Sequence, residues 1–583
     1  MGDAEYNGAR RPMPRLSSSP AHGTDHAVLG LLRVLAAIGG TIAVVALLLY
    51  AGYLGYTDLD PPPVDPPDLG TPEVEAVGRR ISVAGARLER DGRLWTLDLQ
   101  GSPTAMGAAR GLLSARPFID LHRRVLDQIA ARYPSASEAW GASVLLRWRY
   151  RGADAALPDA MREELAAFAA ALPEARTGQY GPYHVLFLYQ VFPDLAKRVD
   201  DVFFEGFAFA VPGRAGAHER GNFLVGRTFD VDLGHDFEPE RLVTFHHPDG
   251  KYPFASVGWP GLIGVVTGVN ARGIFVALDN VRTDDPPEDG LPLSLLARQV
   301  LEEADTLDRA IEMLEAAKVR TAGAFLVADG AAGRAAVVEL SARPNEERRV
   351  VRGDGDPVVF MTNHFASDVF SGDPFNDRIR RDTASGARWQ RLETLLSGTR
   401  RITAERALAI LRDRKGPDGS DAGLGNRNAL ETLHGSHAVV VDLSSMVLWV
   451  GEGPSAIGPF RAFDLRKHLG RPQRLPQTLA DLPADPLLYS AAYADYQQAL
   501  AELDFARRML AEGRLVRART AAAVGLALAP EVGELYRVMG EVERRLGHFA
   551  EARRHFEQYL ELSPGRLRDH ERVRSLLAEL ARE

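Results

Sequence analysis

A single uncharged stretch near the N-terminus restricts the structures that the first part of this chain can adopt. Residues 34–57, VLAAIGGTIAVVALLLYAGYLGYT, contain no charged side chain. As a helix this stretch is roughly 36 Å long, enough to cross a bilayer core of roughly 30 Å. The sequence therefore predicts a transmembrane anchor over residues 34–57, after a short N-tail over residues 1–33.

The charges that flank this helix predict its orientation. Four arginines precede it. All charged residues between it and the next basic residue, Arg79, are acidic. Since positive flanks favour the cytoplasmic side, we expect a single-pass membrane protein. Its N-tail is then cytoplasmic, and the bulk of the chain lies on the extracytoplasmic side, periplasmic or extracellular. The alternative is a cleaved signal peptide, although the apolar region is long for one and no clear A-x-A cleavage motif follows.

The residues after the anchor predict a linker and a mixed domain. Residues 61–72 hold six prolines, which favours a stiff, extended spacer over residues 58–75 that holds the outer domains off the membrane. From residue 76 to residue 475, helical and strand-like patterns alternate. Residues 161–172 have the 3.6-residue period of an amphipathic helix.

After Asp200, short runs rich in β-formers dominate this domain. Two hairpins are expected, with turns at residues 270–273 and 329–330. Between them, residues 292–318 predict two helices, with Thr306 as the N-cap of the second. Hairpins, a helical pair and further strands predict an α+β layered domain.

The last hundred residues predict a helical tail. Pro530 and Pro564 are 34 residues apart, which is the period of tetratricopeptide repeats. Characteristic repeat positions are occupied in the second copy by Tyr536, Met539, Gly540, Ala552 and Phe556, and in the weaker first copy by Phe505, Ala506 and Ala518. Such arrays present a groove for a peptide or protein partner, so we expect tetratricopeptide-like repeats over residues 487–583. The alternative is a helical bundle that only packs on the main domain.

Composition excludes several classes of function. The chain has no cysteine, which removes disulfides, thiolate metal sites and cysteine nucleophiles. No histidine motif has metal-ligand spacing, so we expect neither a metal nor a cofactor. With a formal net charge of −9 and no long basic run, we expect no nucleic-acid partner.

Several motifs follow one another between residues 90 and 465. They are LQGSPTAMGAARGLL, NFLVGRTFDVD, VVTGVNARGIFVAL, ARQVLEEADTLDRAIEML, FLVADGAAGRAAVVEL and VFMTNHF. In this order they resemble the acyl-coenzyme A:6-aminopenicillanic acid acyltransferase family, autoproteolytic N-terminal-nucleophile hydrolases related to choloylglycine hydrolases. The resemblance implies an αββα sandwich. It also implies amide chemistry: hydrolysis of an amide, or transfer of its acyl group.

Five residues match pocket positions of that family: Arg227, Asp230, Asn270, Asn363 and His364. Three residues apart on a strand, Arg227 and Asp230 are expected to face opposite sides and contact different partners. Asn270 is a candidate oxyanion donor. Thr228 stands where the family usually has asparagine. Each position also has a structural reading: a buried ion pair, a turn residue, or a buried histidine with satisfied hydrogen bonds.

The nucleophile of the family has no counterpart. Members of the family cut themselves before a cysteine, whose freed α-amine then serves as the base for its thiol. The equivalent step is Gly206-Phe207, and residues 190–227 contain no Ser, Thr, Cys or Tyr. Phe207 and Phe209 alternate on a strand and are expected to fill the vacated site with apolar bulk.

Three functions follow from this pattern. The first is an uncleaved, membrane-tied pseudoenzyme that binds an amide or acyl small molecule. The second is an active amide hydrolase or acyltransferase that uses another nucleophile, or a water activated near Asp230 and His364. The third is a scaffold that acts through the repeat tail.

Overall fold

The protein is described by a computed structural model that covers residues 23–75, 80–132, 135–172, 180–195, 204–212, 223–231, 241–285, 289–342, 349–470, 479–562 and 567–582. The chain divides into two compact units, residues 1–58 and 59–583. The described part of the first unit consists of the helix α1, Gly23–Thr57, and Asp58.

Helix α1 is long and apolar enough to cross a membrane. Its stretch Leu31–Thr57 has 27 residues and a mean hydropathy of 2.4. The helix expected over residues 34–57 lies inside it. Residues 23–33, expected as part of the N-tail, are also helical, while residues 1–22 lie outside the described part.

Two β-sheets form the centre of the second unit. Over the described residues the larger has 11 strands in the order β1-β2-β3-β4-β7-β8-β9-β10-β11-β12-β13. They are β1 (Glu73–Val74), β2 (Arg80–Val83), β3 (Ala86–Asp91), β4 (Leu94–Gly101), β7 (Leu242–Pro248), β8 (Phe254–Gly258), β9 (Thr267–Asn270), β10 (Ile274–Asn280), β11 (Gly323–Asp329), β12 (Arg334–Leu340) and β13 (Arg349–Arg352). The pair β4–β7 is parallel.

The smaller sheet carries the candidate site. Its order over the described residues is β14-β5-β6-β15-β16-β17, and every pairing in it is antiparallel. The strands are β14 (Val359–Met361), β5 (Phe204–Val211), β6 (Leu224–Val231), β15 (Gly435–Asp442), β16 (Val447–Gly451) and β17 (Phe460–Asp464).

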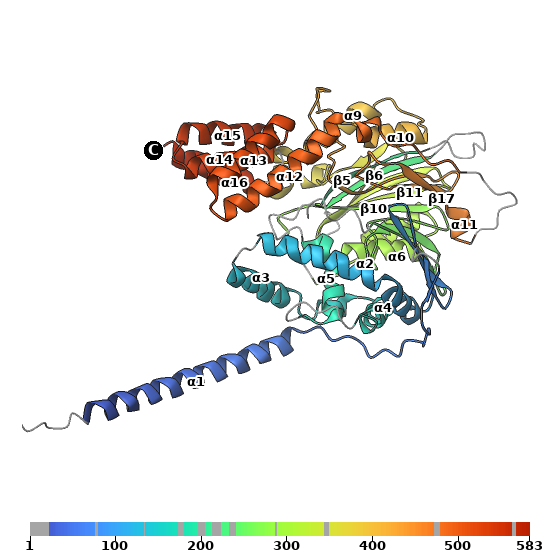
Figure 1. Ribbon diagram of the computed structural model, residues 1–583. Helices are drawn as coiled ribbons and strands as arrows, with labels where there is room; N and C mark the ends of the chain where they lie inside the picture. The colour runs from blue at the N-terminus through green and yellow to red at the C-terminus, as the bar shows by residue number, and fades with distance from the viewer. Residues whose placement is uncertain are drawn as a thin grey trace, which may run out of the picture. The chain divides into compact units, whose positions relative to one another are not determined.

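Apolar side chains fill the space between the two sheets. Phe275, Ala277 and Leu326 of the larger sheet share a buried cluster with Val225 and Val439 of the smaller one. Since neighbouring side chains on a strand point to opposite faces, the intervening residues face outward, toward helices. Figure 1 shows α2, α4, α5 and α6 on one side of the sheets and α9 and α10 on the other.

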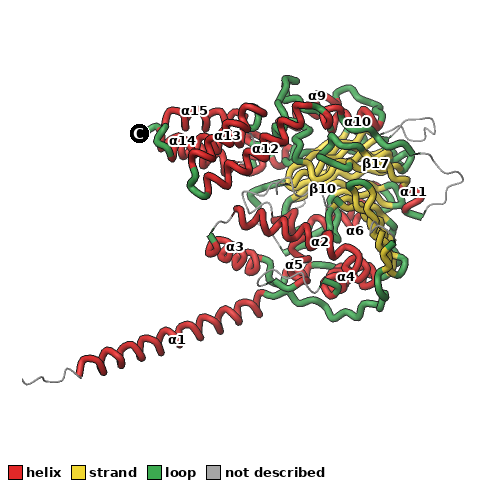
Figure 2. Tube along the Cα trace, viewed as in Figure 1, coloured by secondary structure: helices red, strands yellow, loops and turns green. Residues whose placement is uncertain are grey.

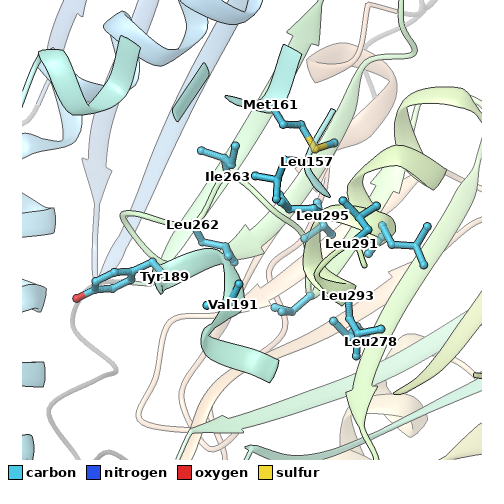
Figure 3. Close-up of a cluster of buried hydrophobic side chains, with 14 of the residues drawn as sticks. Leu157, Met161, Tyr189, Val191, Leu262, Ile263, Leu278, Leu291, Leu293 and Leu295 are labelled. Atoms are coloured by element: carbon cyan, nitrogen blue, oxygen red, sulfur yellow. The ribbon is translucent and has the colours of Figure 1, made fainter. Parts of the chain in front are cut away.

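The outer face of the larger sheet is buried under helices. Val276 and Leu278 of β10 lie in a cluster with Leu293, Leu295 and other side chains from the helices, part of which is drawn in Figure 3. These helices are α2 (Pro103–Arg132), α3 (Ala136–Arg149), α4 (Asp159–Ala170), α5 (Pro182–Leu195), α6 (Leu293–Glu303) and α7 (Leu307–Ala316).

The outer face of the smaller sheet is covered by two further helices. Phe207 and Phe209 of β5 share a cluster with Leu392 and Leu408. These leucines belong to α9 (Ala384–Leu396) and α10 (Ala404–Leu411); α8 (Pro374–Asp382) precedes them.

The local predictions within this unit are confirmed. Strands β9 and β10 form the first expected hairpin, whose turn has Gly273 at φ +89°, a value that favours glycine. Strands β11 and β12 form the second. The helical pair is α6 and α7, and Thr306 caps α7 by accepting a hydrogen bond from the Arg309 amide at 3.2 Å.

The proline-rich segment, expected as a stiff spacer, packs along the domain. Leu59 is buried, and Val64 packs against the same cluster as Leu59. Leu69 packs on another cluster, and Glu73–Val74 forms the edge strand β1. The apolar side chains among the prolines therefore fix this segment to the domain, which the proline count does not reveal.

The C-terminal part is helical, as expected. It contains α12 (Ala491–Ala511), α13 (Leu515–Leu528), α14 (Gly533–Arg545), α15 (Phe549–Leu562) and α16 (Leu567–Leu580), drawn in red in Figure 2. Met539, Gly540, Ala552 and Phe556 are buried. At the positions assigned to the first predicted repeat, Ala506 and Ala518 are buried, but Phe505 is 39% exposed.

Candidate functional site

The site begins with the register of β5 against β6. Glu205 lies opposite Asp230, and Ala208 lies opposite Arg227. Because cross-strand partners share a face, Arg227 and Ala208 point to one side of the sheet while Asp230 and Glu205 point to the other. The opposite orientation predicted for Arg227 and Asp230 is therefore what the strand geometry gives.

Arg227 forms a buried ion pair with the larger sheet. Its Nη1 donates to both carboxylate oxygens of Asp279, at 2.9 and 2.8 Å, and its Nη2 donates to the Leu278 carbonyl. Both charged side chains are at most 1% exposed. Burial raises the pKa of Asp279, and the Arg227 guanidinium opposes that rise. The charge of Arg227 is thus neutralised within the protein.

Gly206 and Asn363 lie beside this ion pair. The Gly206 amide donates to Oδ1 of Asn363 at 3.0 Å. A Cβ placed on residue 206 would lie 2.4 Å from the Thr228 carbonyl oxygen and 3.0 Å from Arg227 Nη1. The position on β5 that adjoins the guanidinium therefore has no room for a side chain.

Phe207 and Phe209 supply buried apolar bulk as expected, but on the Asp230 face of the strand pair and not on the Arg227 face. Both rings lie on the face of β5 that packs under α9 and α10. Residues Gly206 and Ala208, on the other face, adjoin Arg227. The alternation of a strand explains this: only even-numbered residues of β5 share a face with Arg227. Neither face of β5 carries a hydroxyl, thiol or amine.

Asp230 belongs to a second buried charge cluster, beneath α9. Arg388 of α9 contacts Glu205 at 3.0 Å and Asp230 at 3.5 Å, and Arg427 contacts Glu205 at 3.3 Å. Burial raises the pKa of Asp230 to about 6, against the opposing effect of Arg388. The two acids are compensated by two arginines from segments distant in the sequence.

Glu431 extends this cluster. Its oxygens accept hydrogen bonds from the Leu433 amide at 2.8 Å, the Ser455 hydroxyl at 2.7 Å and the Ala456 amide at 2.9 Å. Burial raises the pKa of Glu431 to about 7, and the nearby charge of Asp230 adds to the rise. Sequence reasoning missed Glu205 and Glu431. Glu205 could have been found, because it is the one acid inside the apolar run FEGFAFAV and a buried carboxylate needs a cation as its partner.

Asn270 is fully engaged in structural hydrogen bonds. Its Nδ2 donates to the carbonyls of Leu301 at 2.9 Å and Ala304 at 2.7 Å, and its Oδ1 accepts from the amides of Arg272 and Ile274. Both amide protons are used, so in this conformation Asn270 has none to offer an oxyanion. It ties the β9–β10 turn to the end of α6.

His364 is a buried histidine held by hydroxyl groups. Its Nδ1 lies 3.0 Å from Thr362 Oγ1 and 2.7 Å from Ser385 Oγ. Burial, together with the positive charges of Arg380 and Arg352, lowers the pKa of His364 to about 3. The imidazole is therefore neutral at physiological pH and lies on the α9 side, whereas the adjacent Asn363 reaches Gly206.

Another histidine lies between the sheets, where no sequence motif pointed to it. His437 Nε2 is 2.9 Å from Thr267 Oγ1, and its ring stacks on Phe229 at 5.5 Å. Burial lowers the pKa of His437 well below its ordinary value. Within the described residues no group of three or more His, Asp and Glu side chains is placed to hold a metal ion.

A comparison with known protein families gives a match over residues 217–453. The model of the acyl-coenzyme A:6-aminopenicillanic acid acyl-transferase family matches this segment. The family predicted from the sequence is confirmed there. The segment contains all five predicted pocket residues, whereas Glu205 and Gly206 lie just before it.

Individual relatives are distant. An uncharacterized protein of Archaeoglobus fulgidus is 26% identical over 268 residues, which are 42% of this chain and 44% of that protein. The chain thus matches less than half the length of this curated relative.

Three solved structures have some likeness to part of this chain. The N-acylethanolamine-hydrolyzing acid amidase ortholog of Caenorhabditis elegans has 16% identity, a TM-score of 0.29 and coverage of 41% of this chain and 93% of its own. A mutant conjugated bile acid hydrolase of Clostridium perfringens has 14% identity, a TM-score of 0.31 and coverage of 47% and 98%. Penicillin V acylase of Agrobacterium tumefaciens has 14% identity, a TM-score of 0.26 and coverage of 45% and 86%. TM-scores of this size give no information on the site.

Proposed function

We propose that this chain is a membrane-anchored, uncleaved pseudoenzyme of the acyltransferase and amide hydrolase family. One observation carries the proposal: the charges at the family's pocket positions are neutralised inside the protein. Arg227 is paired with Asp279, and Asp230 lies beside Arg388. In the family's scheme, the α-amine that self-cleavage frees assists the nucleophile. In this chain buried arginines already supply the positive charge in that region.

The layered packing supports the αββα sandwich that the family resemblance implies. Apolar clusters lie between the sheets and under the helices on both outer faces. The anchor part rests on the length and hydropathy of α1. Tyr50, Tyr53 and Tyr56 near its C-terminal end suit the aromatic belt at a membrane interface. The arginines before the uncharged stretch of residues 34–57 support a cytoplasmic N-terminus.

The repeat tail is proposed as the part that meets a protein or peptide partner. The support is the succession of helical hairpins, in which Gly540 allows close contact with Phe556; a Cβ at residue 540 would lie 2.6 Å from that ring.

One observation favours an active hydrolase as second candidate. The Ser385 hydroxyl lies 2.7 Å from His364 Nδ1, the contact expected of a nucleophile and its base. Against it, the serine is 3% and the histidine 1% exposed, and the depressed pKa of His364 makes it a weak base.

A hydrolysis assay separates the two candidates. The purified full-length chain in detergent is incubated with penicillin V, a conjugated bile salt and an N-acylethanolamine, and the released acid is measured by mass spectrometry. We expect no release above that of a heat-inactivated sample. Release that is lost in Ser385→Ala would contradict the pseudoenzyme proposal and support the second candidate.

A further inference from the structure

An exposed apolar face on α3 is the surface with the clearest ligand chemistry. Trp140, Leu145 and Trp148 are 55%, 68% and 45% exposed. On a helix with 3.6 residues per turn, they fall within an arc of about 140°. We call these three residues the α3 face. Three large apolar side chains exposed on one short helix mark a surface suited to a non-aqueous partner.

The chemistry of the α3 face suits a lipid headgroup layer. Tryptophan is favoured at membrane interfaces because its ring is amphipathic. The Arg151 guanidinium lies 4.3 Å from the centroid of the Trp148 ring and donates to the Trp148 carbonyl at 2.8 Å. An aromatic ring beside a cation combines apolar contact with attraction to lipid phosphate.

Chain connectivity brings this part of the domain to the end of α1. The 27-residue stretch Leu31–Thr57, in which Arg33 is the one charged residue, is about 40 Å long, which matches a bilayer together with its headgroup layers. The stretch ends at Thr57, and Leu59 is already buried in the domain. Two residues span at most about 7 Å, so a spanning α1 leaves the surface around Leu59 next to the headgroups.

The 3₁₀ turn that follows α3, Ala153–Ala156, adjoins that point of entry. The Asp60 carbonyl accepts a hydrogen bond from Arg162 at 3.0 Å, and Arg162 lies 3.7 Å from Asp154. Asp154 follows Trp148 by six residues through consecutive hydrogen-bonded turns.

We propose that the α3 face lies on the headgroup layer of the bilayer that α1 crosses, with Trp140, Leu145 and Trp148 inserted and Arg151 at the level of the phosphates. This rests on the proposed anchoring of α1. The domain is then held against the membrane rather than away from it, consistent with the packed linker.

The absence of cysteine allows a direct test. Single variants Leu145→Cys, Val516→Cys and Leu47→Cys of the full chain are spin-labelled and reconstituted into vesicles of phosphatidylcholine and phosphatidylglycerol. Accessibility to oxygen, which partitions into lipid, is compared with accessibility to a water-soluble nickel chelate. Val516 is 72% exposed, on α13, and serves as the aqueous control; Leu47, on α1, reports anchoring.

We expect the labels at residues 145 and 47 to favour oxygen several-fold over the nickel chelate, and the label at residue 516 to favour the chelate. An aqueous reading at residue 145 with a lipid reading at residue 47 would overturn the inference alone. Protection of residue 145 from both reagents would overturn it too, because it indicates a protein contact. Aqueous readings at both residues would overturn the anchoring together with the inference.

Discussion

At the scale of single residues, each family position of this chain is engaged in internal contacts. Arg227 is held by Asp279, Asn270 by the end of α6, and His364 by two hydroxyl groups. The residue types at these positions could be predicted from sequence motifs, because a Gly-Arg-x-x-Asp strand is a local pattern. Their interaction partners could not be predicted. Arg388, for example, pairs with Glu205, 183 residues away in the sequence, and only folding brings the two together.

The Arg227–Asp279 pair makes a stability prediction. Arg227→Met leaves the Asp279 carboxylate buried without its cation, which we expect to cost about 3–5 kcal/mol in the free energy of unfolding near pH 7.5. Because Asp279 then takes up a proton more readily, the loss shrinks at lower pH. Urea unfolding followed by tryptophan fluorescence measures both effects.

Two comparison variants make this test specific. Asp279→Asn added to Arg227→Met removes the orphaned charge and is expected to recover most of the loss. Arg334→Met breaks solvent-accessible pairs with Asp308 and Asp354 and should change stability by only about 0–1 kcal/mol. Equal losses in Arg227→Met and Arg334→Met would refute a special role for the buried pair.

Asp230 makes a prediction about pH. Its pKa is raised from 3.8 to about 6, so the folded state holds this proton more tightly than the unfolded state. The stability that the group contributes is complete below pH 3.8 and is lost as pH rises through 6. Asp230→Asn keeps the neutral form, so its melting temperature should rise relative to that of the parent chain between pH 4 and pH 7. A difference that stays constant with pH would contradict the assignment.

At the scale of elements, strands β5 and β6 are fitted to each other through one glycine. Gly226 lies opposite Phe209, and a Cβ at residue 226 would lie 2.3 Å from the Phe209 ring. The sequence predicted the strands and their alternation correctly. It did not show that the odd-numbered side chains of β5 face the helices, because that depends on which sheet face each layer covers.

This fit predicts compensation between two substitutions. Phe209→Ala removes a fully buried ring and is expected to destabilise by about 3–5 kcal/mol. Gly226→Ala should also destabilise, because its methyl group meets the ring. Combining Gly226→Ala with Phe209→Ala should cost less than the sum of the two single changes in a thermal-unfolding double-mutant cycle; strict additivity would show that the two sites are independent.

At the scale of the whole molecule, the tail and the linker are both packed onto the central domain. Tyr496 of α12 shares a buried cluster with Leu433 and Ile457 of that domain, and Arg378 of α8 pairs with Glu571 of α16. Helices, hairpins and the apolar N-terminal stretch were predictable from local periodicity. The docking of the tail and the burial of Leu59 were not, since composition says nothing about which surface a segment covers.

The intact mass of the purified protein tests the central claim most directly. If the family fold persists without self-processing, no break occurs near Gly206, and one polypeptide spans residues 204–212. We expect a single species near 63.5 kDa, or one shortened only at its N-terminus. Two fragments that meet within residues 204–212 would contradict the account, because such a cut is the self-processing that this chain is proposed to have lost.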